Sequence, residues 1–549
     1  MALEALKWVL IPVIVLLVLL RLRSLFTRGP LHNIPGPKAP SVITGHLKEV
    51  FNSNPWNFHR SILEQYGSVA KVSGFLGEER LYIVDPLALY HIVIKDQSSY
   101  DEPRYSYALN YLLYGDGLSA AQGDEHRKQR KMLNPIFSPK HLRDLVPIFR
   151  DVAYQLRDAI TGKIKNGAEE IDMMDWMTRT ALELIGRAGL GYSFNIMEEG
   201  SVDEYGSAVR SLFPTLVDFA LLIGTLPHLT KIGSPSFRTR VLEKIPIKGL
   251  RSIKEKVDIM EKTSEKIYRT RLAALQQVNE VWDKPAGRSK DIISLLLREN
   301  LKASEEDRLP ASQVVGQMTT LIFGAMDTTS SALARILYLL ALNPGVQEKL
   351  REEVRTAHAS REFTYDDLDK LPYMEAIIRE TLRLHPPLTV MHRVTTQDTV
   401  LPLGTPIRGV DGTVITEIPL PRDSNLMISI LSLNRNKALW GEDAYEWKPD
   451  RWLKPLPAAV MNSKIPGVYS NIMTFWGGPR GCIGFKFSLL EMKVVLGVLM
   501  ESFRFKLSDK EITWDMSIIT VPRPEGSDSK APSLPMKVSL LEPEVTVAG

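Results

Sequence analysis

FWGGPRGCIG, residues 475–484, is the stretch around which the chain is organised, and it contains Cys482, the only cysteine among 549 residues. No intramolecular disulfide can therefore form, and a lone cysteine is most often a small buried apolar side chain. Its neighbours argue against that interpretation. The glycines and the proline around it predict a shaped loop whose backbone comes close to another group.

An amphipathic helix is predicted directly after this loop, over 485–503, because apolar residues recur there at helical spacing. Cys482 would then lie just before the helix N-terminus, where backbone amides and the helix dipole favour a thiolate. Arg480 adds a positive charge two residues earlier. These features suit a sulfur ligand to a metal macrocycle that carries acidic groups.

The loop resembles the heme-binding loop of the cytochrome P450 family, F-x-x-G-x-R-x-C-x-G, at every fixed position. The matching residues are Phe475, Gly478, Arg480, Cys482 and Gly484. The resemblance implies that Cys482 is the axial thiolate of heme iron and that the other four residues belong to the cofactor-binding loop. A thiolate ligand donates electron density to iron and favours cleavage of the O–O bond.

A long helix is predicted over 310–342, starting at a proline and stopped by an Asn-Pro pair. The segment GAMDTT, residues 324–329, forms helix poorly, and its threonines can bond back to carbonyls one turn earlier and bend the helix. A bent core helix is one interpretation. The segment also resembles the P450 pattern A/G-G-x-D/E-T-T, with Ala325 in place of the second glycine. That resemblance implies that Asp327 and Thr328 relay protons during oxygen activation.

A basic run over 126–131 lies on a predicted helix and could be a solvated surface. The family motif at this place is W-x-x-x-R, which contacts the heme propionates. Arg130 matches the arginine and His126 occupies the tryptophan position, so the resemblance assigns both to the cofactor. Arg393 lies where the family places another propionate ligand. The other positive charges of the run could meet an acidic redox partner or be merely solvated.

Glu380 and Arg383 are three residues apart on a predicted helix, a spacing that usually marks a surface ion pair. They match the family's E-x-x-R motif, and Arg451 lies in a matching P-x-R-W segment. The resemblance implies that these three residues form a structural triad behind the cysteine loop, with no catalytic role.

Residues 8–20, WVLIPVIVLLVLL, are an unbroken apolar run followed by arginines. With the preceding residues the run approaches the roughly 20 residues that span a bilayer, although a buried soluble helix is the alternative. Charges on its C-terminal side argue against a cleavable signal peptide and leave the bulk of the chain in the cytosol. We expect a membrane anchor over 1–28, a stiff extended hinge over 33–40, and a heme-thiolate domain over 29–549. The resemblance implies a single-pass protein of the endoplasmic reticulum membrane.

The remaining patterns predict a mainly α fold with small β-sheets, the cytochrome P450 fold. Strands are expected as a hairpin over 71–84, a pair within 399–430, and a closing hairpin of 518–522 with 534–541. The apolar stretch 213–229 could line a lid, touch the membrane or be core. Net charge is 68 − 64 = +4, too small to imply a nucleic-acid partner.

The resemblance covers roughly residue 30 to the end and implies a monooxygenase that inserts one atom of O2 into a substrate. Five candidate substrate-facing stretches carry few charges and predict a lipophilic substrate, namely 105–118, 213–229, 318–328, 388–392 and 518–521. The sequence as a whole resembles those of fungal family members that oxidise terpenoids and other secondary metabolites.

The chain has no dinucleotide-binding fingerprint after a strand, so electrons are expected from NADPH through a separate flavoprotein reductase. Two alternatives stay open. One is a thiolate-heme isomerase or dehydratase, although such enzymes usually disturb the Asp-Thr pair that is intact here. The other is a non-catalytic heme-binding membrane protein.

Overall fold

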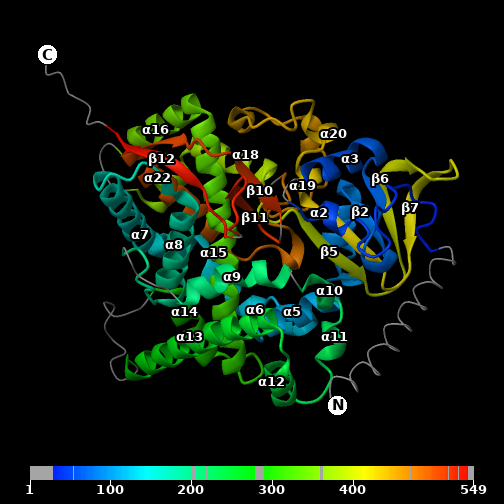
Figure 1. The fold of residues 1–549 in the computed structure, drawn as a ribbon, viewed down its shortest axis with the longest axis horizontal. Helices are drawn as coiled ribbons and strands as arrows, with labels where there is room; N and C mark the ends of the chain where they lie inside the picture. The colour runs from blue at the N-terminus through cyan, green and yellow to red at the C-terminus, as the bar shows by residue number, and fades with distance from the viewer. Residues whose placement is uncertain are drawn as a thin grey trace. The chain divides into compact units, whose positions relative to one another are not determined.

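The computed structural model describes residues 29–541, and its ribbon is drawn in Figure 1. The residues left undescribed within that range are 53–54, 199–203, 218, 279–289, 359–362, 470, 517 and 530. The predicted membrane anchor over 1–28 lies outside the described residues. Among the helices that are described, none combines the length and hydrophobicity that crossing a bilayer requires.

The chain divides into two compact units, and the predicted mainly helical fold with small sheets is confirmed. The first unit contains the described residues up to Pro103, with Thr389–Tyr445 and Pro457–Arg480. The second contains Arg104–Leu388, Glu446–Leu456 and the described residues from Gly481 onward. The chain therefore passes from one unit to the other inside the cysteine loop.

A five-stranded sheet with the order β1-β2-β8-β5-β3 forms the centre of the first unit. The predicted hairpin over 71–84 is confirmed as the antiparallel pair β1 and β2, and β2 pairs in parallel with β8. The strand pair predicted within 399–430, with its turn at 411–412, is confirmed as the antiparallel pair β6 and β7. The strands are β1 (Val69–Ser73), β2 (Glu79–Ile83), β3 (Tyr100–Asp101), β5 (Val390–Thr395), β6 (Thr399–Arg408), β7 (Val414–Leu420) and β8 (Asn425–Ser429). The helices are α2 (Leu47–Val50), α3 (Trp56–Tyr66), α4 (Pro86–Tyr90), α19 (Ile430–Asn434), α20 (Lys437–Trp440) and α21 (Ala458–Met461).

The proline-rich segment over 33–40, predicted as a stiff extended hinge, packs against β1 of the first unit. Leu31 and Ile34 are buried in the core of the first unit. The amide of Lys71 on β1 donates to the carbonyl of Pro35 (2.8 Å). A Cβ on Gly36 would lie 1.9 Å from the Lys71 carbonyl oxygen, so only glycine allows this approach.

The long helix α15 (Ala311–Leu342) is the central element of the second unit and packs against α8, α13, α16, α18 and α22. It confirms the helix predicted over 310–342, except that Pro310 is the residue before the first turn. The second unit contains the following further helices: α5 (Arg104–Tyr114), α6 (Gly123–Leu133), α7 (Pro139–Lys165), α8 (Met173–Leu184), α9 (Glu204–Val217), α10 (Ala220–Ile223), α11 (Leu226–Leu229), α12 (Pro235–Lys244), α13 (Lys248–Val278), α14 (Ile292–Lys302), α16 (Pro344–His358), α17 (Tyr365–Asp369), α18 (Pro372–Leu384) and α22 (Phe485–Ser502).

The C-terminal strands pair differently from the predicted closing hairpin. β11 (Thr520–Pro524) pairs with β10 (Ile512–Met516), and β12 (Pro535–Leu540) pairs with β9 (Phe503–Leu507) and with β4 (Ile171–Asp172). The connection between β10 and β11 is much shorter than the one between β11 and β12, and short connections favour antiparallel hairpins. The prediction failed because it overlooked the strand that precedes 518–522.

Candidate functional site

The first half of the cysteine loop belongs to the first unit and is held in an unusual backbone conformation. Trp476 has φ +58° and Gly478 has φ +59°, both in the left-handed region. A Cβ on Gly478 would lie 2.2 Å from the carbonyl oxygen of Val93. The close approach predicted from the glycines is therefore an approach to the protein's own backbone.

Asn434 fixes the start of this half-loop. Its side-chain oxygen accepts the amide of Met473 (2.9 Å), and its side-chain amide donates to the hydroxyl of Thr474 (3.0 Å). Nothing in the local sequence around Asn434 indicated this role, because its two partners lie 39 and 40 residues further along the chain.

Arg393 lies beside the same half-loop. It is buried on β5, its guanidinium lies 4.7 Å from the centre of the Trp476 ring, and it donates to the carbonyl of His392 (2.7 Å). Desolvation, helped by the nearby arginines, lowers the pKa of His392 to about 3, so His392 is neutral at pH 7. Arg480 lies 4.0 Å from a carboxylate oxygen of Glu102. The predicted loop residue Phe475 packs edge to face on Tyr469.

Cys482 follows Gly481 in the part of the loop that belongs to the second unit, and it is exposed. Gly484 is the N-cap of α22, which begins at Phe485 as predicted. Arg130 donates to the carbonyl of Gly481 (2.6 Å), so α6 holds the residue next to the cysteine. His126 lies one turn earlier on α6 and is buried.

Burial raises the pKa of the Cys482 thiol, and the Gly484 amide and the Arg130 charge oppose this rise without overcoming it. The Gly484 amide at the start of α22 favours the thiolate, as the sequence predicts, although desolvation of the sulfur by the surrounding protein is the larger effect. A coordinated metal ion deprotonates a thiol through its own charge.

The acid and alcohol on α15 lie in a helix that is continuous from 311 to 342. The hydroxyl of Thr328 donates to the carbonyl of Gly324 (2.7 Å), which confirms the predicted back-bond. The Asp327 side chain is partly accessible, but the surrounding protein desolvates it and raises its pKa to about 7, while Arg210 acts in the opposite direction.

Heme requires an accessible sulfur ligand and open space on both sides of a flat ring, and the residues present fit these requirements. Cys482 presents its sulfur beside an amide donor and a cation. A Cβ built on Gly484 or on Gly324 meets nothing within 4 Å, so open space lies beside both positions. Gly324 is exposed although most of α15 is buried.

The structure brings the predicted triad together at a fully buried carboxylate. Arg383 donates to both oxygens of Glu380 (2.8 Å each), and Arg451 approaches one of them (3.4 Å). The indole of Trp452 (2.9 Å) and the amide of Lys448 (3.0 Å) also donate to Glu380, which the sequence motif did not indicate. Five hydrogen bonds from four residues therefore satisfy this buried charge.

The predicted substrate-facing stretches have varied structures. The stretch 105–118 is mostly the helix α5, and its Tyr114 stacks on Phe323 of α15 (ring centres 4.6 Å apart). The stretch 518–521 is tied to α15, because Ser331 donates to the Thr520 carbonyl. The stretch 213–229 spans the end of α9 and the short helices α10 and α11.

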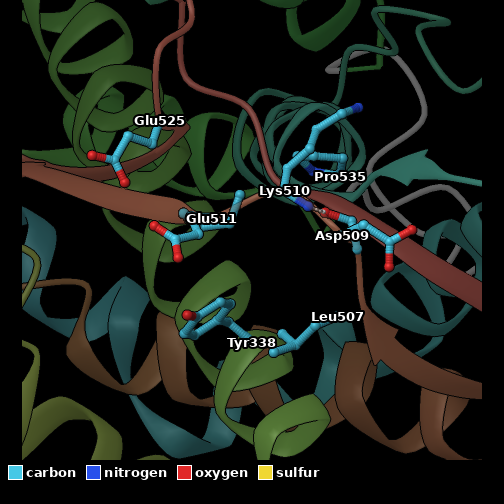
Figure 2. Close-up of a pocket in the computed structure, with 9 residues that line it drawn as sticks. Tyr338, Leu507, Asp509, Lys510, Glu511, Glu525 and Pro535 are labelled. Carbon is cyan, nitrogen blue, oxygen red and sulfur yellow. Dashed lines mark hydrogen bonds between the residues drawn. The ribbon is translucent and has the colours of Figure 1, made fainter.

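A cavity of about 380 Å³ lies in the second unit between α15 and the strands β9 to β12 (Figure 2). It is open and lined by charged side chains, including Asp509, Lys510 and Glu511. Tyr338 is the only side chain of α15 that lines it, eleven residues after Asp327. The cavity contains none of the predicted site residues.

Comparison with known proteins identifies the chain. A family model described as "Cytochrome P450" matches residues 34–526. Cytochrome P450 monooxygenase 81 from Postia placenta is 49% identical over 96% of this chain and 96% of its own. Cytochrome P450 monooxygenase 91 from the same fungus is 47% identical over 98% of this chain and 99% of its own. A ganoderic acid synthetase from Ganoderma lucidum is 42% identical over 94% of this chain and 95% of its own.

These matches define an enzyme class, the heme-thiolate oxidoreductases. The chain belongs to the cytochrome P450 family, and within it to the monooxygenases. The family's cofactor is heme with an axial thiolate, and its electrons come from a redox partner.

Proposed function

We propose that the protein oxidises a lipophilic substrate with O2 at a heme whose axial ligand is Cys482. The observation that carries this proposal is an exposed thiol, the chain's only one, beside the Gly484 amide and Arg130. Heme supplies oxygen activation and electron transfer when bound. The family resemblance assigns His126, Arg130, Arg393 and Arg480 to its propionates. Within the second unit Arg130 donates to the Gly481 carbonyl, and within the first unit Arg393 lies beside the Trp476 ring.

Asp327 and Thr328 would move protons on the distal side. A carboxyl with a pKa of about 7 can take up and release a proton at neutral pH. The Thr328 hydroxyl donates to the Gly324 carbonyl, so its oxygen is free to accept a hydrogen bond on its other side. Glu380, Arg383 and Arg451 act as a structural triad.

Replacement of the sulfur tests the proposal directly. The reduced wild-type protein should show a strongly red-shifted Soret band under carbon monoxide. Cys482→Ser should lack that band and should lose substrate-dependent O2 consumption. A circular dichroism spectrum and melting curve of the variant control for unfolding. A wild-type protein without the band, or a variant that keeps activity, would refute the assignment.

Electrons would come from NADPH through a separate flavoprotein reductase. On α6 the basic residues Arg127, Lys128 and Lys131 would meet an acidic partner, since the pairs of Arg127 with Asp124 and of Lys131 with Asp307 are strongly exposed and contribute little. The substrate would be a terpenoid or another secondary metabolite, and the name of the ganoderic acid synthetase supports this choice. Expression with a reductase in a host fed terpene scaffolds, followed by mass spectrometry, tests both points.

Consumption of O2 and NADPH distinguishes this function from its alternatives. A thiolate-heme isomerase or dehydratase would convert substrate without either reagent. A non-catalytic heme protein would show the carbon monoxide band but no substrate-dependent consumption. The intact Asp327-Thr328 pair favours oxygen activation over the isomerase or dehydratase.

We also propose that the protein is anchored in the endoplasmic reticulum membrane by residues 1–28, with the domain over 29–549 in the cytosol. The region from α10 to α12 would contact the same bilayer, because it exposes apolar side chains at Leu222, Leu229, Ile232 and Phe237. Basic residues accompany them, namely Lys231, Arg238, Arg240, Lys244 and Lys248. Apolar and basic side chains together suit an anionic lipid interface.

Vesicle flotation of a variant that lacks residues 1–28 tests the second contact. We expect it to bind phosphatidylcholine vesicles that contain phosphatidylserine, and to bind less when Leu229, Ile232 and Phe237 are changed to serine. Leu301→Ser on α14, which also removes an exposed apolar side chain, is the control and should bind normally. Equal binding by all three proteins would contradict the proposal.

A further inference from the structure

A short loop between α5 and α6, residues 115–119, lies against α15 at very close range. Gly117 and Gly316 face each other so closely that a Cβ on Gly117 would lie 2.4 Å from the Gly316 carbonyl oxygen. A Cβ on Gly316 would lie 2.5 Å from the Gly117 nitrogen. Two glycines therefore let the backbone of the loop touch the backbone of the helix.

Two fully buried glutamines connect a series of hydrogen bonds around this loop. The amide of Leu118 donates to the side-chain oxygen of Gln317 (3.0 Å), and the side-chain amide of Gln317 donates to the oxygen of Gln129 (2.7 Å). The side-chain amide of Gln129 in turn donates to the carbonyl of Asp116 (3.3 Å). Ser119 and Thr320 add a hydroxyl contact (3.3 Å).

The first donor and the last acceptor in this series of hydrogen bonds fix the direction of every bond between them. The Leu118 amide can only donate and the Asp116 carbonyl can only accept, so neither glutamine can turn its amide around without losing a partner. Leaving such a buried group unsatisfied is unfavourable, because the group has lost its hydrogen bonds to water without a replacement. The loop is thus held by one specific arrangement, with Gln129 contributed by α6 and Gln317 by α15.

Both helices that hold the loop also carry residues of the candidate site. Gln129 directly precedes Arg130 on α6. On α15, Gly324 and Thr328 follow Gln317 by seven and eleven residues, and these spacings place all three on one face of the helix. The loop therefore lies on the same side of α15 as the open space at Gly324 and two turns before it.

We propose that Gln317 and Gln129 are a positioning pair that holds loop 115–119 as a fixed wall of the substrate space and so determines which large ligands bind. This inference rests on the proposed function in one respect: it takes the open space at Gly324 as the side on which the substrate binds. A wall that is already ordered costs nothing to order when a ligand binds against it. A ligand too small to reach the loop should bind with the same affinity whether or not the glutamine pair is intact.

Hydrogen exchange of the heme-loaded full chain tests the first half of the proposal. In Gln317→Leu, peptides that cover 115–119 should exchange at least about tenfold faster, since the loop loses the hydrogen bond from the Leu118 amide to Gln317. Gln347→Leu is the matched control, because Gln347 is also buried and also bonds to a distant backbone, at Phe505. It should leave 115–119 unchanged. If Gln317→Leu does not fold, Gln317→Asn shortens the reach and keeps the polarity.

Spectral titration with two azoles tests the second half. Clotrimazole is large enough to reach the wall, and its Kd should rise about tenfold in Gln317→Leu, which is about 1.4 kcal/mol. The Kd of imidazole should stay the same. Unchanged exchange at 115–119, or equal changes for the two azoles, would overturn the proposal. If imidazole gave no spectral shift in the wild type, the heme assignment would fail, while the exchange result would still report on the pair.

Discussion

Asp327 occupies a position where a carboxyl is difficult to ionise. Its surroundings raise its pKa to about 7, against an ordinary value near 4. Between these two values the folded state binds more protons than the unfolded state, so the contribution of Asp327 to stability falls as pH rises and is constant above 7. The protein retains a group that weakens the fold at neutral pH, as expected of a residue kept for chemistry.

We predict that kcat falls as pH rises above 7, because the protonated Asp327 carboxyl is the form that supplies a proton. Asp327→Asn should lower kcat by about 10²-fold and remove this pH dependence. The measurement is kcat against pH with saturating reductase. Asp366→Asn, at an exposed carboxylate on α17, should keep the wild-type profile. An unchanged profile in Asp327→Asn would contradict the assignment.

Glu380 illustrates how a buried charge becomes indispensable once its partners are in place. Glu380→Gln should lower the free energy of unfolding by about 3–5 kcal/mol, because it leaves buried arginines without a counter-charge. Asp450→Asn is the control one residue before Arg451, where an exposed pair with Lys349 contributes little. Denaturant unfolding of the two variants gives the comparison. A loss for Glu380→Gln no larger than that of the control would show that the triad is dispensable.

At the scale of elements, helices and short hairpins were predicted well, and the pairing of the C-terminal strands was predicted wrongly. The helix α22 and the hairpin of β1 and β2 follow from periodicity within one segment. The partners of β11 and β12 depend on strands elsewhere in the chain, and periodicity does not identify a partner. The same reason hid Asn434 and the glutamine pair, whose contacts join distant segments.

Asp172 joins two elements that are far apart in the sequence. Its carboxylate caps α8 by accepting the amides of Met174 and Asp175, and it also accepts the amide of Leu534 just before β12 (2.8 Å). Asp172→Ala should cost about 2–3 kcal/mol, the sum of a lost cap and an unsatisfied amide. Hydrogen exchange should accelerate over 534–540.

A simple cap provides the control for this prediction. Thr364 caps the short helix α17 at an exposed site, so Thr364→Ala should cost less and leave 534–540 protected. Equal costs for the two substitutions would mean that the bond to Leu534 contributes nothing.

At the scale of the whole molecule, the family and its cofactor could be predicted because short motifs carry them. The motif residues Cys482, Asp327 and Glu380 all have the partners or the open surroundings that their expected roles require. The ionisation of the thiol could not be predicted, since it depends on how much protein surrounds the sulfur. Burial is a property of the fold and not of the local sequence.

The docked segment at the N-terminus has a practical consequence for the design of shortened proteins. β1 is an edge strand, and Pro35 covers part of that edge by accepting the amide of Lys71. A version that begins at Gly29 keeps this cover, whereas one that begins at Ser41 uncovers the edge and removes Leu31 and Ile34 from the core. Uncovered edges recruit strands from other molecules. The longer version should stay monodisperse in size-exclusion chromatography, and the shorter one should aggregate.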